Sequence, residues 1–299
     1  MTRPVETLRW KCFPVVIFSS KNLNRCFWRK CPKILQRPLV GYNLVAYDIT
    51  ISPLSWLSPP TNLTLSNNDV HVWRARLNQS AWRVQQLQEM LSNDERLKAE
   101  RFHFDRDRRR FLVRRGILRT IIAYYMDEEP NRLQFHSGRR GKPYLKQSFG
   151  DHTLQFNLAH SNEIALYAFT CNREIGVDLE YIRDMPDGEQ IALNTFSLLE
   201  NKILQSLPEH QKHEAFFNCW VRKEAYIKAV GDGLYRALDR FDVSLVPGEP
   251  ARLLSVEGNA EEASRWFMKS LTPEHAYVAA LAVKGSDFCL SYWKYPGKS

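Results

Sequence analysis

The sequence has 299 residues, of which 44% are hydrophobic and 25% are charged, so it is ordinary for a soluble protein and long enough for one large or two modest domains. Most of the formal net charge of +9 lies in residues 1–60, and the nearly neutral remainder argues against a general nucleic-acid-binding protein. No CxxC pair occurs and no apolar run is long enough to span a membrane, so we expect a cytoplasmic protein with reduced thiols and no transmembrane helix.

The beginning of the chain differs from the rest. Residues 1–69 start with a basic, cysteine-bearing stretch that shows neither a sustained helical period nor clean alternation, so we expect a poorly ordered N-terminal extension and assign it no function. From residue 70 the pattern is regular. We place an N-terminal lobe at 70–172 and a C-terminal lobe at 173–299, and because no low-complexity linker separates them we expect the two α/β lobes to share an interface.

Helices dominate the first part of the N-terminal lobe. A strand over His71–Leu77 precedes a helix over Trp82–Leu91, and Ser92 has the character of a helix N-cap. A long basic helix then follows over Arg106–Met126. Its arginines form either a solvated face or an anion site, since several guanidinium groups on one helix can hold a phosphate. These arginines are Arg108, Arg110, Arg114, Arg115 and Arg119.

Two short motifs follow this helix. The first, GRRGKPYL at 138–145, combines glycines, basic residues and a proline, which indicates a turn whose backbone can approach a ligand closely. A basic surface turn is nevertheless common. The second, FNLAHS at 156–161, places His160 between a strand end and a turn, where a histidine is more often structural than catalytic. A buried strand over Ile164–Phe169 comes next.

Paired carboxylates mark the next stretch, IGVDLE at 175–180. Side chains alternate along a strand, so Asp178 and Glu180 would share one face while Val177 and Leu179 occupy the other. Two carboxylates on one face repel each other unless a cation lies between them. The pattern therefore indicates either a divalent metal site or a half-exposed edge strand with solvated acids.

The C-terminal lobe continues with helices and then strands. Residues 187–204 have a helical pattern, and a second helix over His213–Val230 contains WVRKEAYIK. Glu224 and Lys228 are four residues apart and share a face of that helix, either as part of a site or as an ordinary surface ion pair. Gly231 suits the helix end. Alternating patterns predict strands over 241–246, 252–256, 265–271, 275–283 and 288–293.

In this order, GKPYL, FNLAHS, IGVDLE and WVRKEAYIK resemble the motifs of the 4′-phosphopantetheinyl transferase superfamily of the Sfp type, over about residues 70–295. The resemblance implies an α+β fold, a pseudo-dimer of two similar α/β lobes with the active site in the cleft between them. The N-terminal lobe would bind the nucleotide of coenzyme A, and the C-terminal lobe would carry magnesium and the catalytic residues.

Residue by residue, the resemblance implies a metal site of Asp178, Glu180 and Glu224. It gives catalytic roles to Glu224, Lys228 and His160. The residues that would bind coenzyme A are Lys98, Arg110, Lys142, His160 and Lys228. The sequence departs from the family pattern at Ala159, where serine is frequent, and at Glu95, near a position that is basic in some members.

The implied reaction moves 4′-phosphopantetheine from coenzyme A to a serine hydroxyl of an apo acyl or peptidyl carrier protein and leaves adenosine 3′,5′-bisphosphate. The implied cofactor is Mg²⁺, and we expect a monomer that binds neither nucleic acid nor membrane. Two alternatives stay open. One is a magnesium-dependent hydrolase of nucleotide pyrophosphates, and the other is a non-catalytic module that binds coenzyme A or a carrier.

Overall fold

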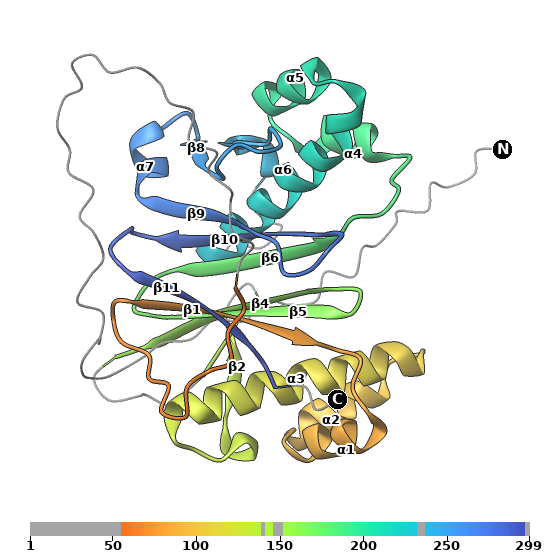
Figure 1. Ribbon diagram of the computed structural model, residues 1–299, viewed down its shortest axis with the longest axis vertical. Helices are drawn as coiled ribbons and strands as arrows, with labels where there is room; N and C mark the ends of the chain where they lie inside the picture. The colour runs from red at the N-terminus through yellow and green to blue at the C-terminus, as the bar shows by residue number, and fades with distance from the viewer. Residues whose placement is uncertain (1–54, 139–140, 146–151, 232–236, 297–299) are drawn as a thin grey trace.

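The computed structural model describes residues 55–138, 141–145, 152–231 and 237–296 (Figure 1). The elements of the first half are β1 (Asp69–Arg76), α1 (Ala81–Glu89), α2 (Asn93–Glu100), α3 (Asp105–Met126), η1 (Pro130–Arg132), β2 (Phe135–Ser137), β3 (Pro143–Leu145), β4 (Leu154–Ser161) and β5 (Ile164–Cys171). Those of the second half are β6 (Ile175–Tyr181), α4 (Gly188–Thr195), α5 (Leu198–Ser206), α6 (Glu209–Val230), η3 (Leu238–Arg240), β7 (Phe241–Val243), β8 (Leu253–Val256), α7 (Ala260–Ser264), β9 (Trp266–Leu271), β10 (Tyr277–Lys284) and β11 (Cys289–Lys294).

Two principal sheets organise these elements. The four-stranded sheet has the order β11-β1-β5-β4, and the three-stranded sheet has the order β6-β10-β9. Strand β11 runs parallel to β1, whereas the other pairs in these sheets are antiparallel. The second half of the chain therefore supplies an outer strand to the sheet of the first half. Two small hairpins, β2-β3 and β7-β8, complete the pairing among the described strands.

The sheets and helices stack in layers, with α1–α3 below the four-stranded sheet and α4–α6 above the three-stranded sheet in Figure 1. Each outer interface has its own apolar core, one formed with α3 and the other with α6. A third core lies between the two sheets, where Val72 and Leu166 from one sheet meet Val177 and Leu281 from the other. Burial of apolar surface on both faces of each sheet thus holds the layers together.

The predicted elements are confirmed in most places. Strand β6 and helices α3 and α6 lie where the sequence patterns put them, and Val177 and Leu179 face the inter-sheet core as alternation requires. The helical pattern over 187–204 is interrupted, because Ser197 caps the start of α5 with a capping box. His160 is the penultimate residue of β4, next to the turn that follows the strand.

The mixed α and β composition is confirmed, while the pseudo-dimer and the division at 172/173 stay predictions. Residues 1–54 of the predicted extension lie outside the described residues. Leu63 and Leu65, which the sequence assigned to that extension, are buried in the core with α3, so the packed part of the chain begins before residue 70. None of the described helices is long and apolar enough to cross a membrane.

Helix α6 lies unusually close to strand β6 at Gly176, the glycine of IGVDLE. A Cβ atom placed on Gly176 would lie 2.1 Å from the backbone oxygen of Ala225 and 2.3 Å from the backbone nitrogen of Ala229. No side chain fits in that space, so glycine on the strand and alanine on the helix allow the two backbones to touch.

We expect Gly176→Ala to lower the free energy of unfolding by roughly 1–3 kcal/mol or more, because α6 must move away from β6 to admit the methyl group. Urea unfolding monitored by circular dichroism measures the change. The control is Gly188→Ala, whose added Cβ would come no closer than 3.8 Å to a neighbouring atom. Equal stability of the two variants would contradict the close packing.

Candidate active site

Strand β6 and helix α6 meet through an ion pair between Asp178 and Lys228. The Lys228 Nζ atom donates a hydrogen bond to Asp178 Oδ1 at 2.5 Å, and both side chains are largely buried. Burial by itself would lower the pKa of Lys228, but the negative charges of Asp178 and Glu224 outweigh it and raise that pKa above its ordinary value. The ammonium group therefore stays charged inside the protein.

Glu224 lies one turn before Lys228 on α6 and is 8% exposed. Its Oε1 atom is buried without a hydrogen-bond partner, and the same holds for Asp178 Oδ2. Burial and the nearby Asp178 raise the pKa of Glu224 to about 7, although Lys228 opposes the shift. Two buried carboxylate oxygens thus lack donors, an arrangement that a hard cation would satisfy.

Glu180 completes the acidic group at the outer end of β6. Ser161 Oγ donates a hydrogen bond to Glu180 Oε2 at 2.8 Å, and Arg183 Nη1 lies 3.8 Å from the same oxygen. Burial and the charge of Asp178 raise the pKa of Glu180. Asp178, Glu180 and Glu224, the three predicted metal ligands, therefore lie within electrostatic range of one another. As they stand, no three acidic, histidine or cysteine side chains of the described chain are arranged to hold a metal ion.

Basic residues lie around His160 on the four-stranded sheet. Burial lowers the pKa of His160 well below its ordinary value, and the positive charges of Arg114, Lys228 and Arg110 lower it further, so the imidazole is neutral. Arg110 Nη2 donates a hydrogen bond to Asn162 Oδ1 at 3.1 Å, which holds the start of α3 against the turn that follows β4. Arg114, Lys228 and Arg110 therefore place positive charge around His160, and the binding of coenzyme A by His160, Lys228 and Arg110 stays a prediction.

Arg114 is another of the arginines that the sequence places either on a solvated face or in an anion site. It lies one helical turn after Arg110 on α3 and is buried, which lowers its pKa to about 10. Among the charged groups it has the largest effect on His160. The four-residue spacing from Arg110 is the signal in the sequence that points to it.

The two predicted phosphate-binding lysines have different environments. Lys98 on α2 has an exposed side chain whose ammonium group lies over the Phe111 ring, and partial desolvation there together with the charges of Arg115 and Arg114 lowers its pKa. Lys142 instead donates a hydrogen bond to the backbone oxygen of Ala229 at 2.5 Å, at the C-terminal end of α6. Burial lowers the pKa of Lys142 to about 7.

Glu95 binds two of the arginines of the basic helix α3. It accepts hydrogen bonds from Arg115 and Arg119, and its Oε2 atom also accepts one from the backbone N–H of Ser92. Burial would raise the pKa of Glu95, but the two arginines lower it below its ordinary value. Arg115 and Arg119 thus both form buried ion pairs with Glu95. These two arginines therefore belong neither to a solvated helix face nor to an anion site, the two alternatives that the sequence left open.

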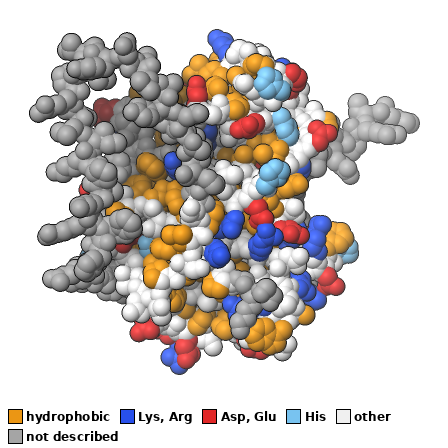
Figure 2. Space-filling model, in the orientation of Figure 1, with side chains coloured by type: hydrophobic (Ala, Val, Ile, Leu, Met, Phe, Trp, Pro, Cys, Tyr) orange, Lys and Arg blue, Asp and Glu red, His pale blue; other side chains and the backbone are white. Residues whose placement is uncertain are grey.

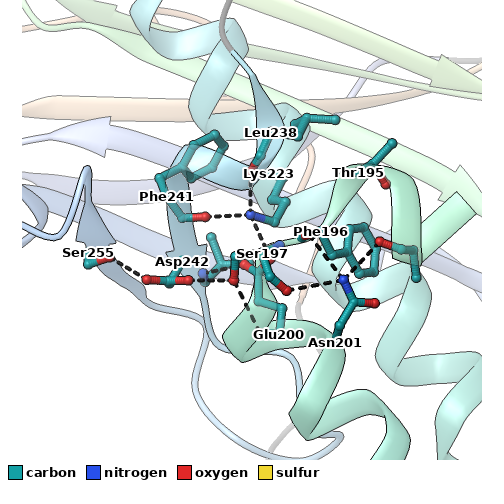
Figure 3. Close-up of polar contacts among 12 residues, drawn as sticks. Thr195, Phe196, Ser197, Glu200, Asn201, Lys223, Leu238, Phe241, Asp242 and Ser255 are labelled. Carbon is teal, nitrogen blue, oxygen red and sulfur yellow. Dashed lines mark hydrogen bonds and ion pairs between the residues drawn. The ribbon is translucent and has the colours of Figure 1, made fainter.

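Lys223, which precedes Glu224, fixes the rotation of α6. It lies 2.7 Å from Glu200 Oε2 and donates to the backbone oxygens of Leu238 and Phe241 (Figure 3). Glu200 in turn accepts from the backbone N–H groups of Ser197 and Val243. With Lys223 held on one side of the helix, Glu224 is directed toward β6.

Figure 2 shows one face of the molecule, on which basic side chains lie beside acidic ones near mid-height instead of forming a broad basic surface. This distribution agrees with the nearly neutral charge of the sequence beyond residue 60. On this face, basic side chains are therefore accompanied by acidic ones.

Known proteins resemble the chain over both halves. A family model described as 4′-phosphopantetheinyl transferase superfamily matches residues 174–282, and one described as 4′-phosphopantetheinyl transferase, N-terminal, matches residues 73–172. The 4′-phosphopantetheinyl transferase HetI of Nostoc sp. is 42% identical over 241 residues, which cover 81% of this chain and 98% of the relative. The 4′-phosphopantetheinyl transferase Sfp of Bacillus subtilis is 29% identical, with 66% of this chain and 84% of the relative covered.

The raised pKa of Glu224 predicts a pH-dependent stability effect in the absence of divalent cations. The folded-state pKa of about 7 exceeds the ordinary value of 4.5, so the carboxylate destabilises the folded state increasingly as the pH rises through this range. Glutamine cannot ionise. We therefore expect Glu224→Gln to raise the Tm by roughly 2–4 °C at pH 8 and to leave it nearly unchanged near pH 4.

Differential scanning calorimetry in the presence of a chelator measures this difference. Glu214→Gln, at an exposed position on the same helix, is the matched control. A Tm difference that is the same at both pH values would refute the assignment of the raised pKa to Glu224.

Proposed function

The chain belongs to the 4′-phosphopantetheinyl transferase superfamily and is a transferase, and we propose that it moves 4′-phosphopantetheine from coenzyme A to a serine hydroxyl of an apo acyl or peptidyl carrier protein. The observation that carries this proposal is the buried group of Asp178, Glu224 and Lys228 beside the positive region around His160. This combination suits a reaction at a pyrophosphate, which is highly charged before and after transfer.

Asp178, Glu180 and Glu224 would hold magnesium. Carboxylate oxygens are the ligands that this ion prefers, and the unpartnered Asp178 Oδ2 and Glu224 Oε1 atoms support the assignment. When bound, the ion would offset negative charge on the pyrophosphate of coenzyme A. Lys228 would then be released from part of its present role of balancing Asp178.

In the proposed reaction, the serine oxygen forms a bond to the β-phosphorus of coenzyme A, and the bond from that phosphorus to the oxygen that bridges the two phosphates breaks. Adenosine 3′,5′-bisphosphate leaves. Glu224 accepts the serine proton, directly or through a water, since a carboxylate positioned beside the hydroxyl can act as a general base. Lys228 and neutral His160 donate hydrogen bonds to the phosphoryl oxygens.

The same proposal assigns nucleotide binding to the lobe at 70–172, with Lys98, Arg110 and Lys142 as phosphate ligands, and the chemistry to the lobe at 173–299. The two lobes form a pseudo-dimer with the site in the cleft between them. The enzyme acts as a cytoplasmic monomer. The division of roles between two lobes is supported by the two long helices, which pack in separate cores: α3 carries Arg110, and α6 carries Glu224.

We expect Asp178→Asn to lower kcat at least about 10²-fold while the protein stays folded, because the substitution removes one negative charge from the metal site and from the Lys228 ion pair. Transfer of labelled phosphopantetheine to a panel of apo carriers in the presence of Mg²⁺ measures the loss. Asp184→Asn, at an exposed nearby position, should transfer at the wild-type rate.

Wild-type turnover by Asp178→Asn would refute the proposed function. Release of free phosphopantetheine without any carrier would instead identify a hydrolase. Binding of coenzyme A in a calorimetric titration, without turnover on any carrier, would identify a non-catalytic module.

Lys142 provides a separate test of nucleotide binding. If it binds the 3′-phosphate, Lys142→Ala should raise the KM for coenzyme A about tenfold with a smaller change in kcat, and dephospho-coenzyme A should show no such rise. Steady-state kinetics with both substrates give the comparison. A lower Tm with equal KM changes for both would show that Lys142 serves only as a contact to the end of α6.

A further inference from the structure

Strands β4 and β6 are the edge strands at which the two principal sheets meet. Two side chains of β4 bind the backbone of β6 there. Asn157 Oδ1 accepts a hydrogen bond from the Val177 N–H at 2.9 Å, and Ser161 Oγ accepts one from the Tyr181 N–H at 3.0 Å. Asn157 and Ser161 are four residues apart on β4, and Val177 and Tyr181 are four residues apart on β6. This spacing fits a strand, in which every second N–H points to the same edge. We call this line of contact the seam.

Ser161 differs from Asn157 in that it also contacts an acid of the site. Its hydroxyl donates to Glu180 Oε2 at 2.8 Å while accepting from the Tyr181 N–H. A serine hydroxyl has a single hydrogen to donate, so the bond accepted from the backbone and the bond donated to the carboxylate together fix its orientation. The hydrogen bond to Glu180 is charge-assisted when that carboxylate is ionised.

The same Glu180 oxygen has a second neighbour. Arg183 Nη1 lies 3.8 Å from Oε2, and its side chain is 41% exposed, compared with 27% for Glu180. Without the Ser161 hydroxyl, the Glu180 carboxylate could turn toward Arg183 and solvent. The seam would then no longer determine where Glu180 lies relative to Asp178 and Glu224.

We propose that Ser161 is a positioning residue that keeps the Glu180 carboxylate near Asp178 and Glu224, where it can join them in binding the metal, an inference that rests on the proposed function. It acts through Glu180 and does not itself contact the reacting groups. Residues that orient metal ligands in this way typically affect metal affinity about 10–100-fold. Through Ser161, the four-stranded sheet contributes to a metal site whose ligands all lie on β6 and α6.

The test compares Ser161→Ala with Ser161→Thr, which keeps the hydroxyl. Titration calorimetry with Mg²⁺ alone gives the Kd, and transfer assays give the Mg²⁺ concentration at half-maximal rate. We expect Ser161→Ala to raise both about tenfold or more, and Ser161→Thr to restore most of the affinity. Unchanged Mg²⁺ affinity in Ser161→Ala, with transfer by the wild type intact, would overturn the positioning role alone.

Two matched controls separate positioning from general stability. Asn157→Ala removes the other bond of the seam, and Thr170→Val removes a buried hydroxyl that donates to the backbone oxygen of Asp69. Both should lower the Tm without changing the Mg²⁺ Kd, and Thr170→Val serves alone if Asn157→Ala does not fold. An equal loss of Mg²⁺ affinity in a folded control would overturn the inference. Absence of Mg²⁺-dependent transfer in the wild type would overturn the proposed function as well.

Discussion

The backbone contact between β6 and α6 at Gly176 is the constraint on which the site depends. Glu224 and Lys228 immediately precede Ala225 and Ala229, the two residues that the glycine touches. The distance between the helix and the strand is therefore set by backbone atoms, which cannot adjust as a flexible side chain does. The 2.5 Å contact from Lys228 to Asp178 spans the same interface between the helix and the strand.

A buried ion pair on another side of α6 complements this contact. Lys223 and Glu200 are almost completely buried, and their remaining hydrogen-bonding capacity is used by backbone groups of three neighbouring segments. An isolated buried charge would be very costly, so the pair tolerates little rotation of the helix. The distance of α6 from β6 and its rotation about its own axis are both fixed in this way. Adjacent residues of the helix therefore point in different directions. Lys223 serves the fold, and Glu224 lies at the site.

Sequence patterns predict the parts of the site that lie within one element. Alternation places Asp178 and Glu180 on one face of a strand, and helical spacing places Glu224 beside Lys228. The partners across elements are not encoded in such periods. That Lys228 pairs with Asp178, that Lys142 reaches the end of α6, and that β11 runs beside β1 all depend on how separate layers meet. Ser161 was visible in a motif, yet its role depends on a contact between two sheets.

The parallel pairing of β11 with β1 has a consequence for synthesis of the protein. Among the described strands, β11 is the last to leave the ribosome, whereas β1 is the first. Until β11 arrives, one edge of β1 is open, and open strand edges readily pair with other chains. The four-stranded sheet can therefore close only after Cys289–Lys294 have been synthesised, and contacts so distant in sequence form slowly. Until then the chain holds β1, β4 and β5 but lacks the strand that covers the remaining edge of β1.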